Sequence, residues 1–148
     1  MAPLPELRGC NQFSYAIIEE KKIFGTTIHR LEEGIDNGDI LFETRFKIPK
    51  NCWVDDLYKI TYQKSLELFK TSLPKIISSI FKPVSQAQLI QERTCSIHFR
   101  KEIDKLKIID LSWSVDKIEK YLRATMKTGF EPPYTFINEK KIYFTKSD

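Results

Sequence analysis

Cysteines are few in this sequence, and their positions build no recognisable site. Cys10, Cys52 and Cys95 are odd in number, lie far apart and form no C-x-x-C pair. Zinc sites and disulfide frameworks need cysteines paired at characteristic spacings. We therefore expect neither a metal site nor a disulfide scaffold, and the cysteine usage favours a reducing, cytoplasmic location.

Long apolar runs and a concentrated charge of one sign are also lacking. No uncharged apolar stretch is long enough to span a bilayer, and residues 1–6 lack the order of an export signal. The net charge is only +4, with basic and acidic residues interspersed. We therefore expect no membrane association, and nucleic-acid binding is disfavoured because it needs a basic face. The pairs Lys21-Lys22 and Lys140-Lys141 suit solvated ends of elements better than a phosphate site.

What remains is the composition of a folded protein. Of the 148 residues, 41% are hydrophobic and 12% are aromatic, which is enough to build a core. This length suffices for one domain or for a piece of a larger one. Pro83 and the Gln and Ser residues near it predict a linker over 83–99, between a unit at 1–82 and a smaller one at 100–148.

Apolar residues recur at helical spacing in three stretches. The longest covers 54–81, where the apolar stripe is interpreted as packing surface and Pro74 predicts a kink or a break. Shorter patterns predict helices over 11–21 and 115–126, the second capped by Ser114. The stripe of the long helix consists of Leu57, Ile60, Thr61, Leu68, Phe69, Leu73, Ile76, Ile77 and Ile80.

Two predicted strands flank a loop that carries acids. Residues 27–31 and 40–48 alternate like strands, and the turn formers from 34 to 39 lie between them. Such a loop can present carboxylates to a ligand from the end of a sheet. The alternative is a plain surface turn made of residues that tolerate left-handed backbone, and spacing alone leaves both open. Aromatic and β-branched residues over 134–144 predict a terminal hairpin.

Three motifs in this order resemble the folate-dependent formyltransferases. They are Leu-Pro-Glu-Leu-Arg-Gly at 4–9, Gly-Thr-Thr-Ile-His at 25–29 and Gly-Ile-Asp-Asn-Gly-Asp-Ile-Leu at 34–41. That family includes methionyl-tRNA formyltransferase, glycinamide ribonucleotide formyltransferase and the sugar N-formyltransferases. The resemblance implies an α/β fold: the C-terminal half of a formyltransferase-type Rossmann-like domain, followed by a small helix and β-hairpin tail.

The resemblance also implies transfer of a formyl group from 10-formyltetrahydrofolate to an amine, without a metal. Asp36 matches the family's catalytic aspartate, and His29 matches a supporting histidine near the pterin end of the cofactor site. Arg8 and Gly9 match a loop that borders the acceptor. The residues that the resemblance implies for cofactor binding are Gly34, Ile35, Asp36, Asn37 and Gly38.

Two members of the family's catalytic trio, an Asn and a His, have no counterpart here. They precede the Leu-Pro of the first motif in the family, whereas Leu4-Pro5 follows only three residues in this sequence. We therefore expect a partial enzyme with an exposed sheet edge. Three alternatives stay open: a separate chain supplies the N-terminal half, the protein is a non-catalytic subunit or relic, or the sequence is a fragment of a longer protein.

The tail over 109–134 resembles the sugar N-formyltransferases more than the tRNA-modifying member, which continues into a β-barrel. The expected acceptor is therefore an amino group on a nucleotide-linked sugar, and the C-terminal hairpin is expected to form a homodimer. Methionyl-tRNA formyltransferase-type activity and formyltetrahydrofolate hydrolysis, with water as the acceptor, remain as alternatives.

Overall fold

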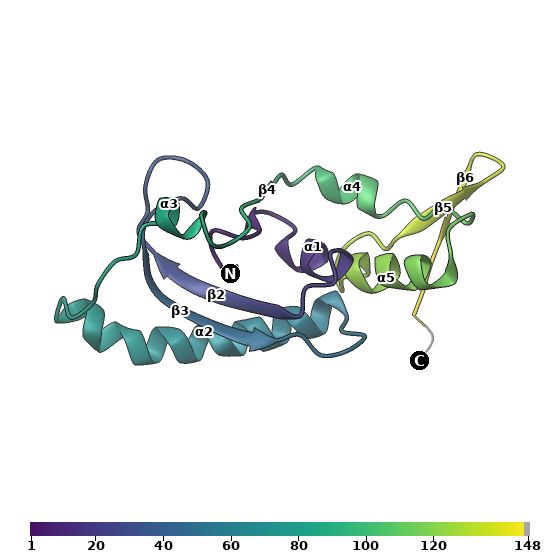
Figure 1. Cartoon of the computed structure of the whole chain (residues 1–148). Coiled ribbons are helices and arrows are strands. Elements are labelled where there is room, and N and C mark those ends of the chain that lie inside the picture. The colour runs from purple at the N-terminus through teal and green to yellow at the C-terminus, as the bar shows by residue number, and fades with distance from the viewer. Residues whose placement is uncertain (147–148) are drawn as a thin grey trace.

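Helices and short strands alternate along residues 1–146, the part of the chain that the computed structural model describes (Figure 1). The expected mixed α/β fold, with a helix and hairpin at its C-terminal end, is confirmed. Within the described residues, no helix combines the length and the apolar character needed to cross a bilayer. The elements are β1 (Arg8–Gly9), α1 (Gln12–Ile18), β2 (Ile23–His29), β3 (Ile40–Lys47), α2 (Val54–Ile77), α3 (Gln86–Leu89), β4 (Ile97–His98), α4 (Glu102–Leu106), α5 (Val115–Thr125), β5 (Tyr134–Ile137) and β6 (Lys140–Tyr143).

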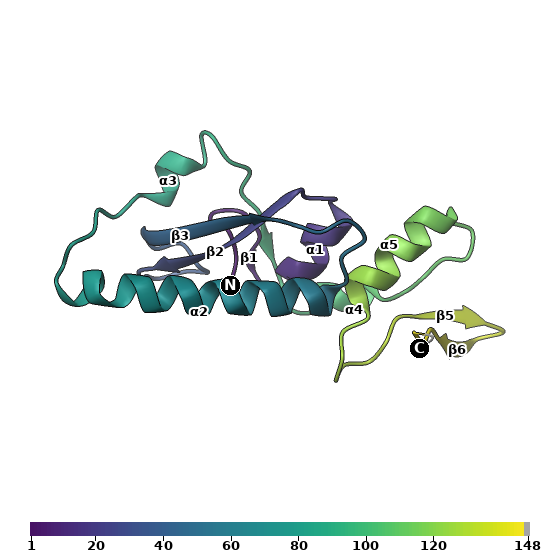
Figure 2. The same ribbon diagram turned by 90° about the horizontal axis from the view of Figure 1, so that it is seen from below.

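The antiparallel ribbon of β2 and β3 is the central layer. Because successive side chains of a strand point to opposite faces, its two faces meet different partners. Thr26 accepts a hydrogen bond from Ser65 of α2 at 2.9 Å, whereas Thr27 donates to the carbonyl oxygen of Ala2 at 3.2 Å. Helix α2 therefore covers one face and the N-terminal segment covers the other, as Figures 1 and 2 show from two directions.

The first strand lies earlier than the sequence predicts. It begins at Ile23 and ends at His29, so Arg30 and Leu31 of the predicted strand over 27–31 lie outside it. The pairing register shifts after Ile28, and the chain then leaves the ribbon. Leu31 is 95% exposed because nothing packs over the loop at that point. The strand prediction is therefore wrong at both of its ends.

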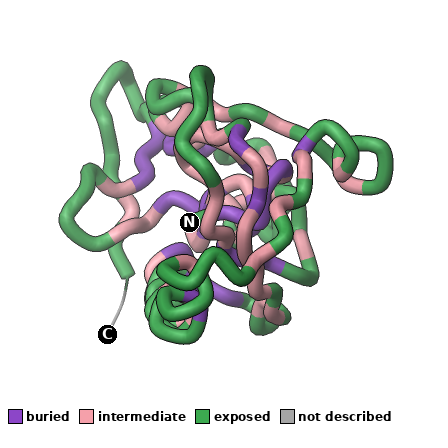
Figure 3. Tube along the Cα trace, turned by 90° about the vertical axis from the view of Figure 1, so that its left-hand side faces the viewer, coloured by how far each residue is buried: buried purple, intermediate pink, exposed green. Residues whose placement is uncertain are grey.

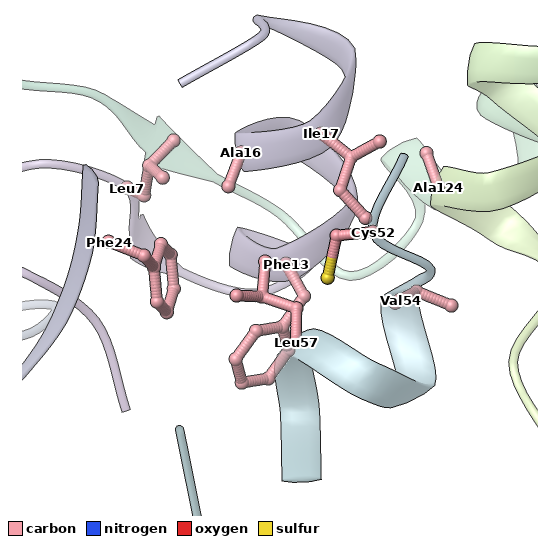
Figure 4. Close-up of a cluster of buried hydrophobic side chains, with 9 residues drawn as sticks. All are labelled: Leu7, Phe13, Ala16, Ile17, Phe24, Cys52, Val54, Leu57 and Ala124. Carbon is pink, nitrogen blue, oxygen red and sulfur yellow. The ribbon is translucent and has the colours of Figure 1, made fainter. Parts of the chain in front are cut away.

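The main core joins the first part of the chain to its C-terminal helix. Phe13 of α1 lies 5.4 Å from Phe24 of β2, measured between ring centroids, and Ala124 of α5 is fully buried against them. Figure 3 shows the buried residues gathered inside the molecule, and Figure 4 shows the core side chains converging between the helices. The members of this cluster are Leu7, Phe13, Ala16, Ile17, Phe24, Cys52, Val54, Leu57 and Ala124.

The segment 83–99 is attached to the rest of the molecule at both of its ends. Val84 forms a bridge to Ile40 at the start of β3, and β4 pairs in parallel with β1. The hairpin of β5 and β6 is tied down through Tyr134, whose N–H donates to the carbonyl oxygen of Lys107 at 2.9 Å. The division into units at 1–82 and 100–148, and the homodimer through the hairpin, remain predictions.

Helix α2 passes through Pro74 without a break. It is continuous from Val54 to Ile77, so the predicted break is wrong, and the helix stops before residue 81. Proline removes the N–H that would bond to the carbonyl oxygen four residues earlier, at Lys70. Both residues are exposed, so water can satisfy that oxygen. The helix ends three residues later, where Ser78 donates to the carbonyl oxygen of Pro74 at 3.0 Å.

The interpretation of the whole α2 stripe as packing surface is also wrong. The buried residues of this helix are Val54, Leu57, Thr61 and Ser72. A second row, made of apolar side chains, lies roughly a third of a turn away from these buried residues around the helix. Its side chains are between 37% and 76% exposed, because a two-stranded ribbon covers only one side of a helix. We call this row the exposed stripe; it consists of Tyr62, Leu66, Phe69, Leu73 and Ile77.

The exposed stripe predicts binding of a hydrophobic dye. Contiguous apolar patches on a protein surface mark interaction sites. We expect the double variant Phe69→Gln, Leu73→Gln to lose at least about half of the fluorescence of bound anilinonaphthalene sulfonate, while its free energy of unfolding changes by less than about 1 kcal/mol. Leu57→Ala, on the buried side, should instead lose about 2–5 kcal/mol of stability. Unchanged dye fluorescence in the double variant would contradict this assignment.

Candidate functional site

The loop between β2 and β3 holds Asp36 in an unusual backbone conformation. Its φ of 46° lies in the left-handed region, which aspartate tolerates better than most residues. The buried side chain of Gln86 donates two hydrogen bonds across the loop, to the carbonyl oxygens of Asp36 at 2.8 Å and Gly38 at 2.7 Å. A Cβ at Gly38 would clash with the carbonyl of Arg30. The loop is therefore fixed from both sides, and Gln86 is a contributor that the sequence did not reveal.

The Asp36 carboxylate is the point where the predicted site residues meet. One oxygen accepts a hydrogen bond from the Gly9 amide at 3.0 Å, and the other lies 3.8 Å from Nε2 of His29. The opposite ring nitrogen of His29 is 2.8 Å from the carbonyl oxygen of Arg30, so that nitrogen carries a proton. The structure thus brings Asp36, His29 and Gly9 together. The carboxylate is 40% exposed, which leaves it open to a ligand.

Arg8 has an unused hydrogen-bond donor. Its Nη2 donates to the sulfur of Cys95 at 3.3 Å, while its buried Nε has no hydrogen-bond partner among residues 1–146. Buried donors are almost always paired, so one without a partner requires an explanation. An anionic or carbonyl ligand beside β1 would satisfy it.

Three of the four remaining predicted loop residues lie on its outer side. Gly34, Ile35 and Asn37 are exposed, and Gly38 is buried beneath them. The methyl Cγ2 of Ile35 would lie 3.5 Å from a Cβ on Gly9, so this side chain borders the point where the carboxylate is held. These residues form one surface around Asp36. Their roles in cofactor binding remain predictions.

The strand that carries Gly9 is held by a partner far away in sequence. Gly9 pairs with His98, and the Cys10 amide donates to the His98 carbonyl oxygen at 2.8 Å. The Leu7 amide donates to the hydroxyl of Ser96 at 3.1 Å. The position of the Gly9 amide, and with it that of the Asp36 carboxylate, therefore depends on residues 96–98.

A side-chain network fixes β4 in turn. The two ring nitrogens of His98 lie 3.2 Å from the hydroxyl of Ser96 and 3.1 Å from a carboxylate oxygen of Glu102. Tyr15 stacks on the His98 ring and donates to the same carboxylate at 2.7 Å. Burial and the hydrogen bond to Glu102 raise the pKa of Tyr15, so it stays a neutral donor. The spacing of four between His98 and Glu102 was the only local signal of this network.

Comparisons with known proteins identify the family. The family model described as formyl transferase matches residues 2–73. The bifunctional polymyxin resistance protein ArnA of Wigglesworthia glossinidia brevipalpis is 30% identical over 97% of this chain and 21% of its own length. A methionyl-tRNA formyltransferase of Clostridium perfringens is also 30% identical, over 82% of this chain and 38% of its own.

Solved structures overlay on almost the whole chain. The N-formyltransferase from Helicobacter canadensis, in complex with folinic acid and dTDP-3-aminofucose, superposes with a TM-score of 0.78 at 25% identity, over 95% of this chain and 50% of its own. The sugar 3N-formyl transferase WlaRD gives a TM-score of 0.79 at 27% identity, over 95% of this chain and 49% of its own. A 4-N formyltransferase from Francisella tularensis shares the fold with a TM-score of 0.85 at 22% identity, over 98% of this chain and 59% of its own.

These overlays define a mixed α/β domain of which this chain carries about half. Residues 2–73 belong to the formyltransferase family, and 95% of the chain overlays on a solved N-formyltransferase. It spans 21% and 38% of the two curated relatives and about half of the solved structures named above. The resemblance inferred from the three sequence motifs is confirmed, and two of the solved relatives contain folate derivatives.

The close approach of β1 to β4 predicts a specific sensitivity at Gly9. Gly9 has a φ of 84° and Gly129 has a φ of 82°, so alanine is strained at both positions. A Cβ at Gly9 would also lie 2.5 Å from the His98 carbonyl oxygen, whereas a Cβ at Gly129 meets nothing within 4 Å. In urea unfolding we expect Gly129→Ala to cost about 1–2 kcal/mol and Gly9→Ala clearly more. Equal losses of stability in the two variants would mean that β4 shifts to make room for the Cβ at position 9.

Proposed function

We propose that this protein takes part in formyl transfer from 10-formyltetrahydrofolate to an amine carried by a nucleotide-linked sugar. The observation that carries the proposal is the Asp36 carboxylate, held by the Gly9 amide and faced by His29 inside the segment that matches the family. Support for the folate and the sugar comes from the Helicobacter canadensis enzyme, which was solved with folinic acid and dTDP-3-aminofucose.

The chemistry requires a group that manages a proton. When the amine attacks the formyl carbon, a C–N bond forms, the carbonyl oxygen becomes an oxyanion and the attacking nitrogen becomes positively charged. Collapse breaks the bond from the formyl carbon to the folate nitrogen, which takes up a proton as the amine loses one. In this proposal Asp36 accepts that proton directly or through a water, and His29, 3.8 Å away, passes one on.

We further propose that the reaction needs the remainder of a formyltransferase domain, in the same polypeptide or in another. In each of these solved relatives, the part that does not overlay on this chain is about as long as the part that does. Within residues 1–146, β2 pairs only with β3, and the exposed stripe of α2 lies alongside. A segment that extends the sheet would cover this apolar row and supply the Asn and His that have no counterpart here.

Replacing Asp36 with asparagine tests the assigned role. Asparagine keeps an oxygen that can accept from the Gly9 amide, so the loop is retained while the proton acceptor is lost. In the complete enzyme we expect kcat to fall by about a hundredfold or more, with KM for both substrates changed only a few-fold. Transfer of labelled formyl to the sugar amine measures this. Glu33→Gln, an exposed change in the same loop, is the matched control.

Four outcomes of that experiment are decisive. An unchanged rate in the Asp36→Asn variant would refute its catalytic role. Labelled formate released without an acceptor would identify a hydrolase, and formylation of methionyl-tRNA in place of the sugar would assign the other acceptor. No product from the complete assembly would favour a non-catalytic subunit.

A further inference from the structure

A pocket of about 200 Å³ lies at the end of the β2–β3 ribbon that is farthest from the Asp36 loop. The ribbon closes there, where the Ile48 amide donates to the carbonyl oxygen of Lys22 at 2.9 Å. Because a strand rises about 3.3 Å per residue, Lys22 lies roughly 20 Å from His29 at the other end of β2. A ligand in this pocket therefore takes no part in the transfer itself.

Three separate segments build the walls of this pocket. They are the C-terminal end of α1, the loop between β3 and α2, and one side of α5, which lie together in Figures 1 and 2. Five basic side chains line it, against the single acidic side chain of Glu20. We call it the basic pocket; its cations are Lys21, Lys22, Lys50, Lys120 and Arg123. Five against one leaves an excess of four positive charges, as large as the net charge of the whole chain.

Two of the five cations have acidic partners at the surface. The Lys120 ammonium lies 3.4 Å from a carboxylate oxygen of Glu20, and the Lys21 ammonium lies 3.2 Å from one of Glu19. The Glu20 side chain is 67% exposed, so water and salt screen its attraction to Lys120. These pairs therefore offset little of the positive charge.

The other three cations have no acidic partner within residues 1–146. No ion pair in this part of the chain involves Lys22, Lys50 or Arg123. The Arg123 guanidinium makes a long hydrogen bond, from Nη1 to the carbonyl oxygen of Cys52 at 3.4 Å. Like charges gathered in one place repel one another and destabilise the compact state. A negatively charged ligand would relieve this repulsion.

The backbone fixes the rim of the basic pocket. Helix α1 ends with Glu20 in the left-handed region, at a φ of 54°. The amides of Glu20 and Lys21 donate back to the carbonyl oxygens of Ile17 and Ala16, at 3.1 and 3.0 Å, in a common form of helix closure. On the facing loop, Asn51 is also left-handed, with a φ of 56°. A ligand would therefore meet a preformed surface and lose little affinity to ordering it.

A second hollow of about 440 Å³ continues the basic pocket along α5. The two hollows share Glu20, Lys120 and Arg123, so they form one groove. Further charged residues of both signs line the second hollow: Asp116, Lys117 and Glu119. The basic pocket is smaller than the roughly 300–1,000 Å³ of sites for small organic molecules. The groove therefore suits a chain molecule whose anionic groups enter the basic pocket.

The charge pattern of the groove favours a peptide over RNA. An RNA backbone carries a negative charge at every nucleotide, so in the second hollow it would meet Asp116 and Glu119. A peptide can present carboxylates to the basic pocket and continue with neutral or basic residues. Carboxylates also form strong charge-assisted hydrogen bonds with Lys and Arg side chains.

We propose that the basic pocket docks an acidic segment of a partner protein, which then runs along α5. Complementary charges of this kind steer the encounter of two proteins and suppress wrong partners. Because the pocket and the Asp36 loop lie at opposite ends of the ribbon, docking leaves the candidate site open. The proposal therefore holds or fails independently of the transfer reaction.

Peptide binding to the intact protein tests this proposal. The probe is a fluorescein-labelled peptide with four consecutive glutamates between Gly-Ser flanks, followed by fluorescence anisotropy at low salt. We expect it to bind at least about tenfold more tightly than the same peptide with four glutamines. Equal affinities for the two peptides would overturn the proposal. Tighter binding of a single-stranded RNA of the same net charge, or of inorganic phosphate, would overturn it as well.

Charge-reversal variants assign the binding to the basic pocket. The double variant Lys22→Glu, Lys50→Glu changes two exposed side chains, so its free energy of unfolding should change little. We expect it to bind the glutamate peptide at least about tenfold more weakly. The matched control is Lys75→Glu, Lys140→Glu, which alters the net charge equally at exposed positions on α2 and β6 and should weaken binding less than about twofold. Equal weakening in both double variants would show attraction by net charge alone and would overturn the proposal.

Discussion

The hydrogen bond from the Gly9 amide to the Asp36 carboxylate is the contact on which the candidate site depends. It joins two segments that are 27 residues apart, and each is held by a further element. Gln86 clamps the loop from α3, and the pairing with His98 fixes β1. Neither a left-handed aspartate nor a two-residue strand is stable by itself. The carboxylate therefore has one defined position only because three regions of the chain converge on it.

The proposed function gives the half-covered helix α2 and the two trio residues without a counterpart a common explanation. A two-stranded ribbon buries one side of α2, and the exposed stripe lies on another side that such a ribbon cannot reach. By the resemblance, the Asn and the His of the family's trio precede Leu4-Pro5, and neither is present among residues 1–3. Under the proposal that the remainder of a formyltransferase domain completes the molecule, the same segment covers the stripe and brings both residues. Under that proposal, one segment would account both for the exposed stripe and for the two residues without a counterpart.

The sequence predicted those features that local patterns determine. Ser114 caps α5 by accepting a hydrogen bond from the Lys117 amide at 3.4 Å, and the terminal hairpin forms where alternation indicated it. The pairing of β1 with β4 and the clamp by Gln86 escaped prediction, because they link positions 48 to 89 residues apart. The stripe of α2 was misinterpreted for a different reason. Periodicity identifies apolar rows on a helix, but only the neighbouring elements decide which row is buried.

The distribution of charged residues shows the same limit of prediction from local sequence patterns. A net charge of +4 with interspersed signs argues against a basic surface, yet the fold gathers Arg100, Lys107 and Lys127 around one cavity between α1, α4 and α5. These residues come from the two flanks of α4 and from the segment after α5, a region with no motif of its own. The matched motifs at 4–9, 25–29 and 34–41 meet at the Asp36 carboxylate instead.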